Sequence, residues 1–570
     1  MTRSPPLDAK SRTRRLLLAG AGACVLAGQR AAQCVAGSNA PANTRLNAPR
    51  EWPTDATSPQ VTLQVNADRL SHRIDRRVFG TNLEWFNDAG GLGVPQLLPR
   101  LVQEARDLGT TVFRFPGGTL ADYYDWHDGT GPRDARPNRH HPTDAGSSKN
   151  RFGSPELFDL MQATGAEALL TVNAGTGSPQ EAAEWVAYCN SAASPRREAD
   201  GFAKPLGIKL WEIGNELYLP GNPDEVKITV TPDVYAERYL AFVEAMRAVD
   251  PTITTIGIGV AMGAHIGPDT QFPDWSDVLL KKAAPRLDMI AVHNSYFPEL
   301  YNVMTPPVET VYPALWAAPD AVEGSLNRLA ALMSRYEGAR RDPIGIAVTE
   351  WGALFSVPQR DPYWTDHVKT LGSALYTART LQVLLAHPRV KLANHFKFTD
   401  RSFMGMVNYE GNPKVPFHAF RMFAKHTGTH LVAAQFDTMP GYDTDGIGNI
   451  AARRDVPDVT VLATRDGDTG RLYVNLVNRS LRRSHRIKLN LQGIAPQPGG
   501  TLVTLRGPQP TSHNGRDLPP EWPYSAAYEP YSTVADGLDL QQAAWRTAEP
   551  LVLAPFSVAT FTVEDARFAG

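Results

Sequence analysis

Two glutamates stand in distinctive surroundings along this chain. One closes the segment Trp211-Glu-Ile-Gly-Asn-Glu216, and the other lies within Ala347-Val-Thr-Glu350-Trp-Gly352. Two carboxyl groups that face each other suit hydrolysis of a glycosidic bond, in which one acts as general acid/base and the other as nucleophile. Asn215, directly before the first glutamate, is able to hydrogen-bond a sugar hydroxyl beside the reacting carbon. The alternative for each glutamate is a salt-bridged carboxylate at the edge of a loop.

The elements that must position these glutamates repeat one pattern, a short apolar strand, a polar loop and then a helix. Near-continuous apolar strands that alternate with helices indicate a parallel sheet covered on both faces. Eight such units predict an α/β fold of the (β/α)8 TIM barrel type, with a doubly wound open sheet as the alternative. The expected strands are Val78–Trp85, Thr111–Gly118, Glu167–Ala174, Lys209–Glu216, Thr254–Val260, Met289–Tyr296, Ile344–Trp351 and Lys391–Phe398. The clearest expected helices are Leu97–Leu108, Gln180–Asn190, Asp233–Val249, Leu326–Tyr336 and Ser373–Leu385.

Polar residues recur at the ends of these strands. In a barrel the carboxyl ends of the strands form the active site, so Glu216 on the fourth strand and Glu350 on the seventh are expected to face each other across the mouth. A separation of about 5 Å between their carboxyl groups would predict a retaining mechanism, and about 8–9 Å an inverting one. The other strand-end residues are Glu84, Arg114, Asn173, Asn215, His293 and Asn394.

A different pattern begins after about residue 430. Alternating strands without helices between them predict a C-terminal antiparallel β-sandwich domain. The predicted domains are the barrel at 59–430 and the sandwich at 431–570, and segment 59–70 is able to pair with the sandwich. The long Pro- and Tyr-rich stretch 507–547 receives no assignment. The expected strands are Val61–Val65, Val459–Thr464, Arg471–Asn478, His485–Leu491, Thr501–Leu505 and Val552–Thr562.

The amino terminus has the pattern of an export signal. Arg14 and Arg15 precede a Gly- and Ala-rich apolar run at 16–28, which is too short for a membrane-spanning helix of about 20 residues. Adjacent arginines before such a run predict a twin-arginine signal peptide over 1–36, followed by a linker over 37–58, and export to the periplasm or the exterior. An ordinary secretory signal and a disordered tail are the alternatives. No other segment is long and apolar enough for a membrane span.

The composition is that of an ordinary globular protein rather than of a nucleic-acid-binding or disulfide-rich protein. Of 570 residues, 42% are hydrophobic and 20% charged, and the net charge is -2. This balance lacks the basic field of a nucleic-acid-binding protein. Only 3 cysteines occur, Cys24, Cys34 and Cys189, which excludes a disulfide scaffold. No Rossmann glycine fingerprint, P-loop or zinc spacing is present, so no cofactor and no metal are predicted.

Several longer segments resemble the α-L-arabinofuranosidases of glycoside hydrolase family 51, within the large clan of barrel glycosidases (clan A). The Asn-Glu pair identifies only the clan, whereas the segments after strands two and three are more specific. The resemblance covers about residues 61–490 and implies a carbohydrate substrate, an oligo- or polysaccharide. The segments are Val78–Glu84, Phe113–Gly118, Tyr124–Pro132 with Arg136-Pro137, Asn173–Gly177, Glu181–Asn190 and Leu472–Ser480.

The resemblance also implies roles for single residues. Glu216 would be the acid/base and Glu350 the nucleophile, and Arg114 would hold the carboxylate of the nucleophile. Glu84 and Asn215 would bind sugar hydroxyls. The remaining expected substrate contacts are Trp126 as a wall of the sugar pocket, with a packing aromatic as the alternative, and on strand six His293 and Tyr296, with a satisfied structural histidine as the alternative for His293.

Three departures from the family pattern fall in the region that contacts the sugar. Thr119 replaces an expected Asn, Ser295 stands where a Tyr is expected, and strand eight (Asn394-His-Phe-Lys397) lacks an expected Gln. They leave the exact sugar open, so a retaining relative such as a β-xylosidase, a β-glucuronidase or an endo-glycanase is the second hypothesis. A non-catalytic carbohydrate-binding protein is the third.

Overall fold

The computed structural model describes residues 57–568 apart from short internal gaps. The gaps are 86, 97, 141–146, 221–227, 264–269, 294–296, 300–306, 339, 357–365, 401–403, 409–410 and 514–537. The predicted signal peptide, nearly all of the predicted linker and Tyr296 therefore lie outside the described residues. Within the described ranges, no helix is both long enough and apolar enough to cross a bilayer.

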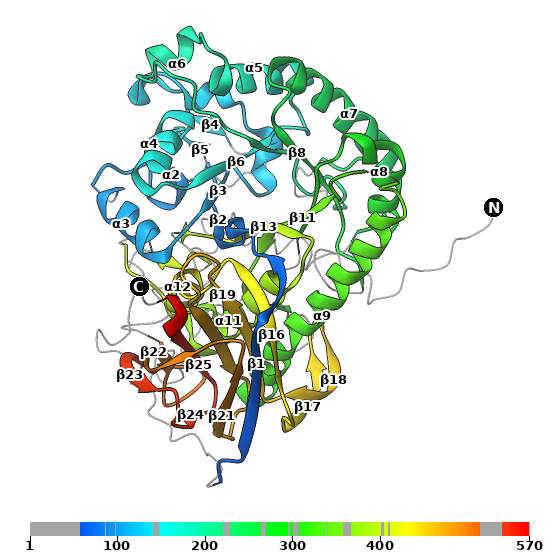
Figure 1. Cartoon of the computed structure of the whole chain (residues 1–570). Helices are drawn as coiled ribbons and strands as arrows, with labels where there is room; N and C mark the ends of the chain where they lie inside the picture. The colour runs from blue at the N-terminus through cyan, green and yellow to red at the C-terminus, as the bar shows by residue number, and fades with distance from the viewer. Residues whose placement is uncertain are drawn as a thin grey trace, which may run out of the picture.

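Eight parallel strands close into a barrel in their order along the chain (Figure 1). Every predicted barrel strand is present, because each apolar run is buried on both faces. The prediction of a TIM barrel is confirmed, and the open-sheet alternative is wrong, because the last barrel strand, β13, pairs with the first, β2. The strands are β2 (Gly80–Asn82), β3 (Val112–Phe115), β6 (Glu167–Val172), β7 (Leu210–Ile213), β8 (Thr254–Ile258), β9 (Met289–His293), β11 (Gly345–Trp351) and β13 (Val390–His395).

One long helix follows each barrel strand and covers the outside of the barrel. The helix before strand seven, α9, starts at Val308, well before the predicted Leu326. Pro313 and Pro319 lie inside it and hide the part before Leu326, its whole first half included, from a sequence pattern. Tyr312 and Trp316 of that first half are fully buried, and this packing holds the helix together across the prolines. The helices are α3 (Leu98–Leu108), α4 (Ser154–Thr164), α5 (Pro179–Asn190), α7 (Pro232–Val249), α8 (Trp275–Ala283), α9 (Val308–Ser334), α11 (Leu371–Ala386) and α12 (Val415–Lys425).

The interior of the barrel is divided into an apolar and a polar half. A closed cluster of strand side chains fills the interior near the amino ends of the strands, where the barrel is a packed core rather than a pore. The polar strand-end residues lie above this cluster, at the opposite end. The members of the apolar cluster are Val112, Leu169, Leu210, Ile256, Met289, Ala291, Ala347 and Leu392.

The second domain is a sheet of nine strands, ordered β23-β22-β25-β20-β19-β16-β1-β21-β24. All neighbours are antiparallel except β1 and β21, which run parallel. Trp545 of β23 and Leu551 of β24 lie at opposite ends of this order, yet they belong to one buried cluster. The sheet is therefore curled around its own core. Its strands are β1 (Gln60–Arg73), β16 (His430–Phe436), β19 (Val459–Arg465), β20 (Leu472–Asn478), β21 (His485–Gln492), β22 (Pro496–Arg506), β23 (Asp539–Arg546), β24 (Leu551–Leu553) and β25 (Ser557–Asp565).

Two details of this domain differ from the expected strands. The single strand expected over Val552–Thr562 is divided into β24 and β25 by a turn in which Phe556 has φ +35°. β23 lies within 507–547, which received no assignment. A hairpin of β17 (Gly441–Ile447) and β18 (Ile450–Pro457) leaves the sheet, and its Tyr442 hydroxyl donates to the carbonyl of Pro313 in α9 at 3.0 Å. The hairpin thereby ties the second domain to the barrel.

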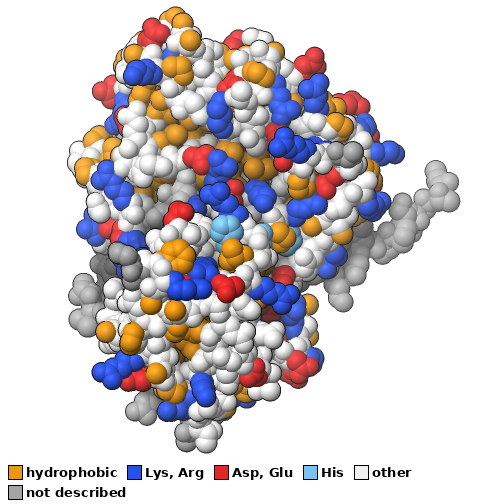
Figure 2. Space-filling model, in the orientation of Figure 1, with side chains coloured by type: hydrophobic (Ala, Val, Ile, Leu, Met, Phe, Trp, Pro, Cys, Tyr) orange, Lys and Arg blue, Asp and Glu red, His pale blue; other side chains and the backbone are white. Residues whose placement is uncertain are grey.

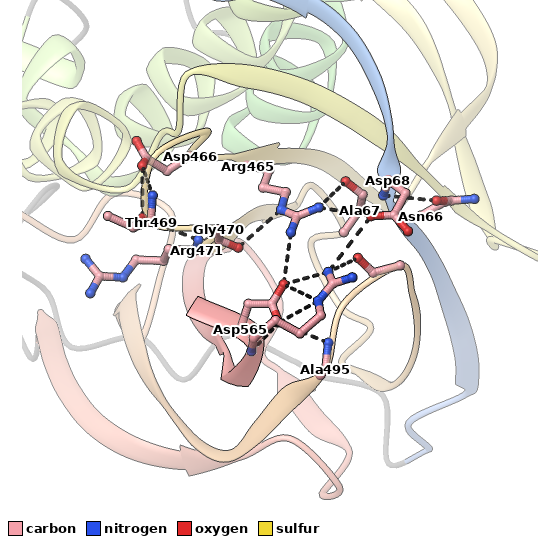
Figure 3. Close-up of polar contacts among 12 residues, drawn as sticks. Asn66, Ala67, Asp68, Arg465, Asp466, Thr469, Gly470, Arg471, Ala495 and Asp565 are labelled. Atoms are coloured by element: carbon pink, nitrogen blue, oxygen red, sulfur yellow. Dashed lines mark hydrogen bonds and ion pairs between the residues drawn. The ribbon is translucent and has the colours of Figure 1, made fainter. Parts of the chain in front are cut away.

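A network of ion pairs joins β1 to β25, which are the first and the last strand of this sheet along the chain (Figure 3). The Asp565 carboxylate accepts hydrogen bonds from Arg465 at 2.9 Å and from Arg567 at 2.6 Å, and its side chain is fully buried. Arg465 also donates to the carbonyl of Ala67 and to Asp68 in β1, both at 3.1 Å. The hydrogen bonds from Arg567 outweigh burial and lower the pKa of Asp565 to about 2.

This network predicts a stability effect with a defined pH dependence. A carboxylate whose pKa is lowered on folding stabilises the folded state above its unfolded pKa of about 4, and the effect is lost as the pH falls toward 2. Asp565→Asn should therefore cost about 1–2 kcal/mol at pH 7 and clearly less at pH 3. Asp68→Asn, in the same network but 61% exposed, should cost less than about 0.5 kcal/mol. Thermal unfolding midpoints at the two pH values measure both effects, and equal losses for the two variants would contradict the assignment.

Candidate active site

The structure brings the two glutamates together at the carboxyl ends of the barrel strands. Glu350 lies in β11, and Glu216 lies three residues after the end of β7. One carboxylate oxygen of each, together with a ring nitrogen of His293, form a group of three atoms that all lie within 4.8 Å of one another. Glu350 is 2% exposed, so the pair lies at the bottom of the barrel mouth.

A strained turn aims Glu216 into the mouth. Gly214 has φ +83° and Glu216 has φ +48°, and a non-glycine residue in this left-handed region costs about 1–2 kcal/mol. The backbone N–H of Asn215 between them donates to the Asp122 carboxylate at 3.0 Å, which fixes the turn. Burial raises the pKa of Asp122 to about 8, although the hydrogen bond from Asn215 opposes this. Strain of this kind is concentrated at functional sites.

Arg114 on β3 connects the groups that surround the two glutamates. Its fully buried guanidinium donates to Glu350 at 2.8 Å, to Glu212 at 2.6 Å and to the side-chain oxygen of Asn215 at 2.7 Å. Asn82 accepts a further bond at 3.2 Å. Burial lowers the pKa of Arg114, but the two carboxylates outweigh burial and the net direction is upward. Arg114 is therefore a fixed positive charge against Glu350.

Asn215 retains a hydrogen-bond donor that no described residue uses. Its side-chain oxygen is occupied by Arg114, whereas its side-chain nitrogen is buried and lacks a protein partner among the described residues. A buried donor without a partner costs about 1–3 kcal/mol. An acceptor on a bound ligand would remove that cost, as expected for a residue that binds a sugar hydroxyl.

His293 on β9 lies between the two carboxylates. Its Nδ1 is 2.6 Å from an oxygen of Glu216 and 3.7 Å from an oxygen of Glu350, and its Nε2 is 3.1 Å from the Thr349 hydroxyl. Burial lowers the pKa of His293, but Glu350 and Glu216 outweigh burial and the net direction is upward. His293 therefore joins the two carboxyl groups through direct contacts.

Glu84 lies in an ion-paired cluster at the mouth rather than alone. Lys397, from the strand-eight segment that departs from the family pattern, contacts the Glu84 carboxylate and lies 3.4 Å from Asp400. Burial raises the pKa of Glu84 to about 7 even though Lys397 opposes this shift. Burial lowers the pKa of Lys397, but Asp400 and Glu84 outweigh it and the net direction is upward. The segment after strand eight thus supplies a positive charge to the surroundings of Glu84.

Trp126 has the contacts of a packing aromatic. It is 3% exposed, its ring stacks on His127 at 4.0 Å and on Trp185 of α5 at 6.0 Å, and its ring N–H donates to the carbonyl of Glu181 at 3.1 Å. Its contacts are therefore with the helix behind the mouth. The predicted contact at Tyr296 falls outside the described residues. Asn173 braces the loop after β6 through Thr176, whose backbone N–H donates to it at 2.9 Å.

Sequence patterns missed several residues of this site. Glu212, Asp122 and Thr349 carried no separate signal, although Glu212 belongs to the motif that contains Glu216. A small pocket beside Glu216 is lined by Thr119, Asp122, Tyr123, Asn215 and Ile228. Thr119, a departure from the family pattern, therefore lies next to the reacting groups.

The same three central residues offer the kinds of atom that bind a divalent metal ion. Glu216, His293 and Glu350 supply two carboxylate oxygens and an imidazole nitrogen within reach of one another. The Arg114 guanidinium already lies against Glu350 at 2.8 Å, and its positive charge opposes a cation at this point. The geometry fits an acid/base and a nucleophilic role for the two carboxyl groups better than metal ligation.

Comparisons with known proteins agree with the geometry in indicating a glycoside hydrolase. Residues 104–293 match the model of the alpha-L-arabinofuranosidase 1 domain. The chain is 24% identical over 491 residues to an intracellular exo-α-(1→5)-L-arabinofuranosidase of Bifidobacterium longum, an alignment that covers 79% of this chain and 84% of the relative. It is 26% identical over 414 residues to an exo-α-(1→6)-L-arabinofuranosidase of the same organism, with 69% and 76% covered.

Solved structures agree with the fold. The crystal structure of an α-L-arabinofuranosidase from Thermotoga maritima in complex with arabinose superposes with a TM-score of 0.71 at 24% identity, over 89% of this chain and 100% of that chain. At this identity the likeness concerns the fold. With the domain match and the two relatives, it confirms the resemblance inferred from the sequence.

Proposed function

We propose that this chain, a glycoside hydrolase that resembles the family 51 α-L-arabinofuranosidases, releases terminal α-L-arabinofuranose from an oligo- or polysaccharide with retention of configuration. The observation that carries the mechanism is the approach of Glu216 and Glu350 oxygens to within 4.8 Å. Retaining glycosidases separate their two carboxyl groups by about 5–5.5 Å, and inverting ones by about 6.5–9.5 Å. The exo-acting relatives support release of terminal residues.

In the first step, Glu350 is the nucleophile and Glu216 the acid. The Glu350 carboxylate, held by Arg114 and His293, attacks the anomeric carbon of the sugar. Glu216 donates its proton to the glycosidic oxygen, the bond between that oxygen and the anomeric carbon breaks, and the leaving group departs as an alcohol. The product is a covalent ester between the sugar and Glu350.

In the second step, Glu216 becomes the base. It takes a proton from water, the water oxygen attacks the anomeric carbon, and the ester bond to Glu350 breaks. Two inversions give net retention. His293, at 2.6 Å from Glu216, holds the carboxyl group in place and is able to share its proton while the role changes from acid to base.

A panel of nitrophenyl glycosides tests this proposal against its alternatives. We expect hydrolysis of nitrophenyl α-L-arabinofuranoside well above that of the β-xyloside and β-glucuronide, and release of the α-anomer first as seen by NMR. Preference for another glycoside would favour a different retaining glycosidase. The ion-paired cluster around Glu84 is compatible with such a substrate. Inactivity on the whole panel combined with saccharide binding would favour a binding protein.

The cluster around Lys397 disfavours an anionic sugar. Two carboxylates, Glu84 and Asp400, already contact this one ammonium group. A uronate would add a third carboxylate to this cluster, and its negative charge would also lie near Glu350. The β-glucuronidase alternative is therefore the weakest of the related glycosidases.

Export through a twin-arginine signal is a second proposal, supported by Arg14, Arg15 and the apolar run that follows them. Replacement of both arginines by lysine should leave the precursor in the cytoplasm, because the twin-arginine signal is recognised by its receptor through these residues. Fractionation of cells that express each form, with an antibody against the chain, measures the effect. Unchanged export of the double variant would contradict this route but not secretion itself.

A further inference from the structure

A groove at the opposite end of the barrel from the glutamates carries a concentration of positive charge. It has a volume of about 770 Å³ and lies where η2 (Arg76–Phe79) precedes β2 and where β3, β6 and β13 begin. Figure 2 shows Lys and Arg side chains near the middle of this face, where Figure 1 places β2, β3 and β13. The charged residues that line the groove are Arg73, Asp75, Arg76, Arg77, Arg106, Glu167 and Lys391.

Only one of these cations is neutralised by the groove's acidic residues. Arg77 binds Glu167 at 2.8 Å and lies 3.8 Å from Asp75. Arg76 donates to two backbone carbonyls, and Arg106 and Lys391 to one each.

Carbonyl groups orient a guanidinium or ammonium group without cancelling its charge. Arg73 has no side-chain partner among the described residues. Four cations thus face one groove without a carboxylate partner in the described part of the chain, on a protein whose net charge is -2.

Two histidines near Lys391 have lowered pKa values. Burial lowers the pKa of His387 to about 4, and His72, Arg389 and Lys391 lower it further. Burial also lowers the pKa of His72, with Lys391 among the additional causes. Burial is the main cause of both shifts, and the positive charge of Lys391 adds to it.

The groove suits a chain of carboxylates better than a nucleic acid. Arginine forks bind carboxylates in pairs of hydrogen bonds. A nucleic acid carries a much denser row of charges, which would extend beyond the few cations of this groove. A saccharide polymer is also the ligand class that a glycoside hydrolase meets.

We propose that this groove is a binding site for an acidic polysaccharide, a polymer of uronic acids, separate from the active site. Bound there, the enzyme would remain on an anionic polymer while its active site, at the other end of the barrel, meets neutral side branches. The site extends the proposed function, on which the choice of a saccharide as the ligand rests, whereas the charge of the groove does not depend on it.

Affinity electrophoresis of the full chain in gels that contain polygalacturonate tests this site. We expect the wild-type chain to be retarded, less so as salt is added, and not retarded by the fully methyl-esterified polymer, which has the same backbone without the charge. The double variant Arg73→Glu/Arg106→Glu should bind polygalacturonate about tenfold more weakly. Both side chains are exposed, so the fold should not be affected.

A matched control carries the same change of charge elsewhere. Arg486→Glu/Lys488→Glu places two reversals on exposed positions of β21 and should leave retardation unchanged. Equal loss in both double variants, equal retardation by the esterified polymer, or equally tight binding of duplex DNA would overturn the proposal. Hydrolysis of a nitrophenyl glycoside should be the same in all forms. A chain that binds the polymer yet hydrolyses no glycoside would refute the proposed function and leave this inference intact.

Discussion

Replacement of Glu350 by alanine should remove nearly all hydrolysis, by a factor of at least about 10⁴, on natural and activated substrates alike. The nucleophile takes part in formation of the covalent intermediate whatever the leaving group is. Steady-state rates on a nitrophenyl glycoside and on an arabinose-containing oligosaccharide measure the loss. Substantial unassisted activity in this variant would mean that the nucleophile lies elsewhere.

Glu216→Ala should instead lower the rates on the two substrates to different extents. Protonation of the leaving group matters only when that group is a poor one, so the natural glycoside should lose most of its rate while the aryl glycoside keeps more of its first step. Deglycosylation should then be slow, because no base activates water, and the intermediate should accumulate as a burst of nitrophenol.

Azide separates the two roles by stereochemistry. It needs no base, so with Glu216→Ala it should speed turnover and give a glycosyl azide with the anomeric configuration of the substrate. With Glu350→Ala it should give at most the inverted azide, because it attacks the substrate directly. Rescue of both variants with the same configuration, or of neither, would contradict the assignment of acid/base and nucleophile.

Arg114→Lys should lower kcat by about 10²–10³-fold and also destabilise the fold by about 3 kcal/mol. A lysine keeps the charge but cannot reach Glu212, Glu350 and Asn215 together, because it lacks the planar fork. Two buried carboxylates would then share one mobile ammonium group. Thermal unfolding and rates per folded molecule measure the two effects separately.

Arg197→Lys is the matched control for this substitution. Arg197 is as fully buried as Arg114, but its guanidinium donates to backbone carbonyls, among them those of Tyr188, Ser191 and Phe202. The control should lower the unfolding midpoint while kcat stays near the wild-type value. If Arg114→Lys behaved in the same way, Arg114 would be a structural arginine only.

The barrel could be predicted from sequence because its strands are buried on both faces. Each of the eight apolar runs led to a strand of the barrel. Only the last third of helix α9 was predicted, since prolines inside a helix look like its end. The prediction of the curled sheet was less complete, because β23 is mostly exposed and lies beside a long Pro-rich stretch. Local patterns are weakest where pairing across long distances decides the structure.

The site was predictable to the extent that its residues end strands. Glu216, Glu350, Arg114, Asn215 and His293 do, and the structure brings them together. Asp122 and Lys397 come from loops whose path no local pattern fixes, so their contacts with Asn215 and Glu84 needed the three-dimensional structure. For Trp126 the motif identified the residue but not its contacts, because a motif does not say which neighbours a side chain packs against.

The position of β1 has a consequence for how the chain is made. Of the elements that the structure describes, this strand is the earliest in the chain, yet it lies between β16 and β21, which begin at His430 and His485. At about 5–20 residues per second, β1 waits tens of seconds for its neighbours, while the whole barrel emerges in between. During that time its apolar residues, among them Leu63 and Val65, have no sheet to join, and they are a natural target for a chaperone. A fragment that stops at the end of the barrel would make this waiting state permanent.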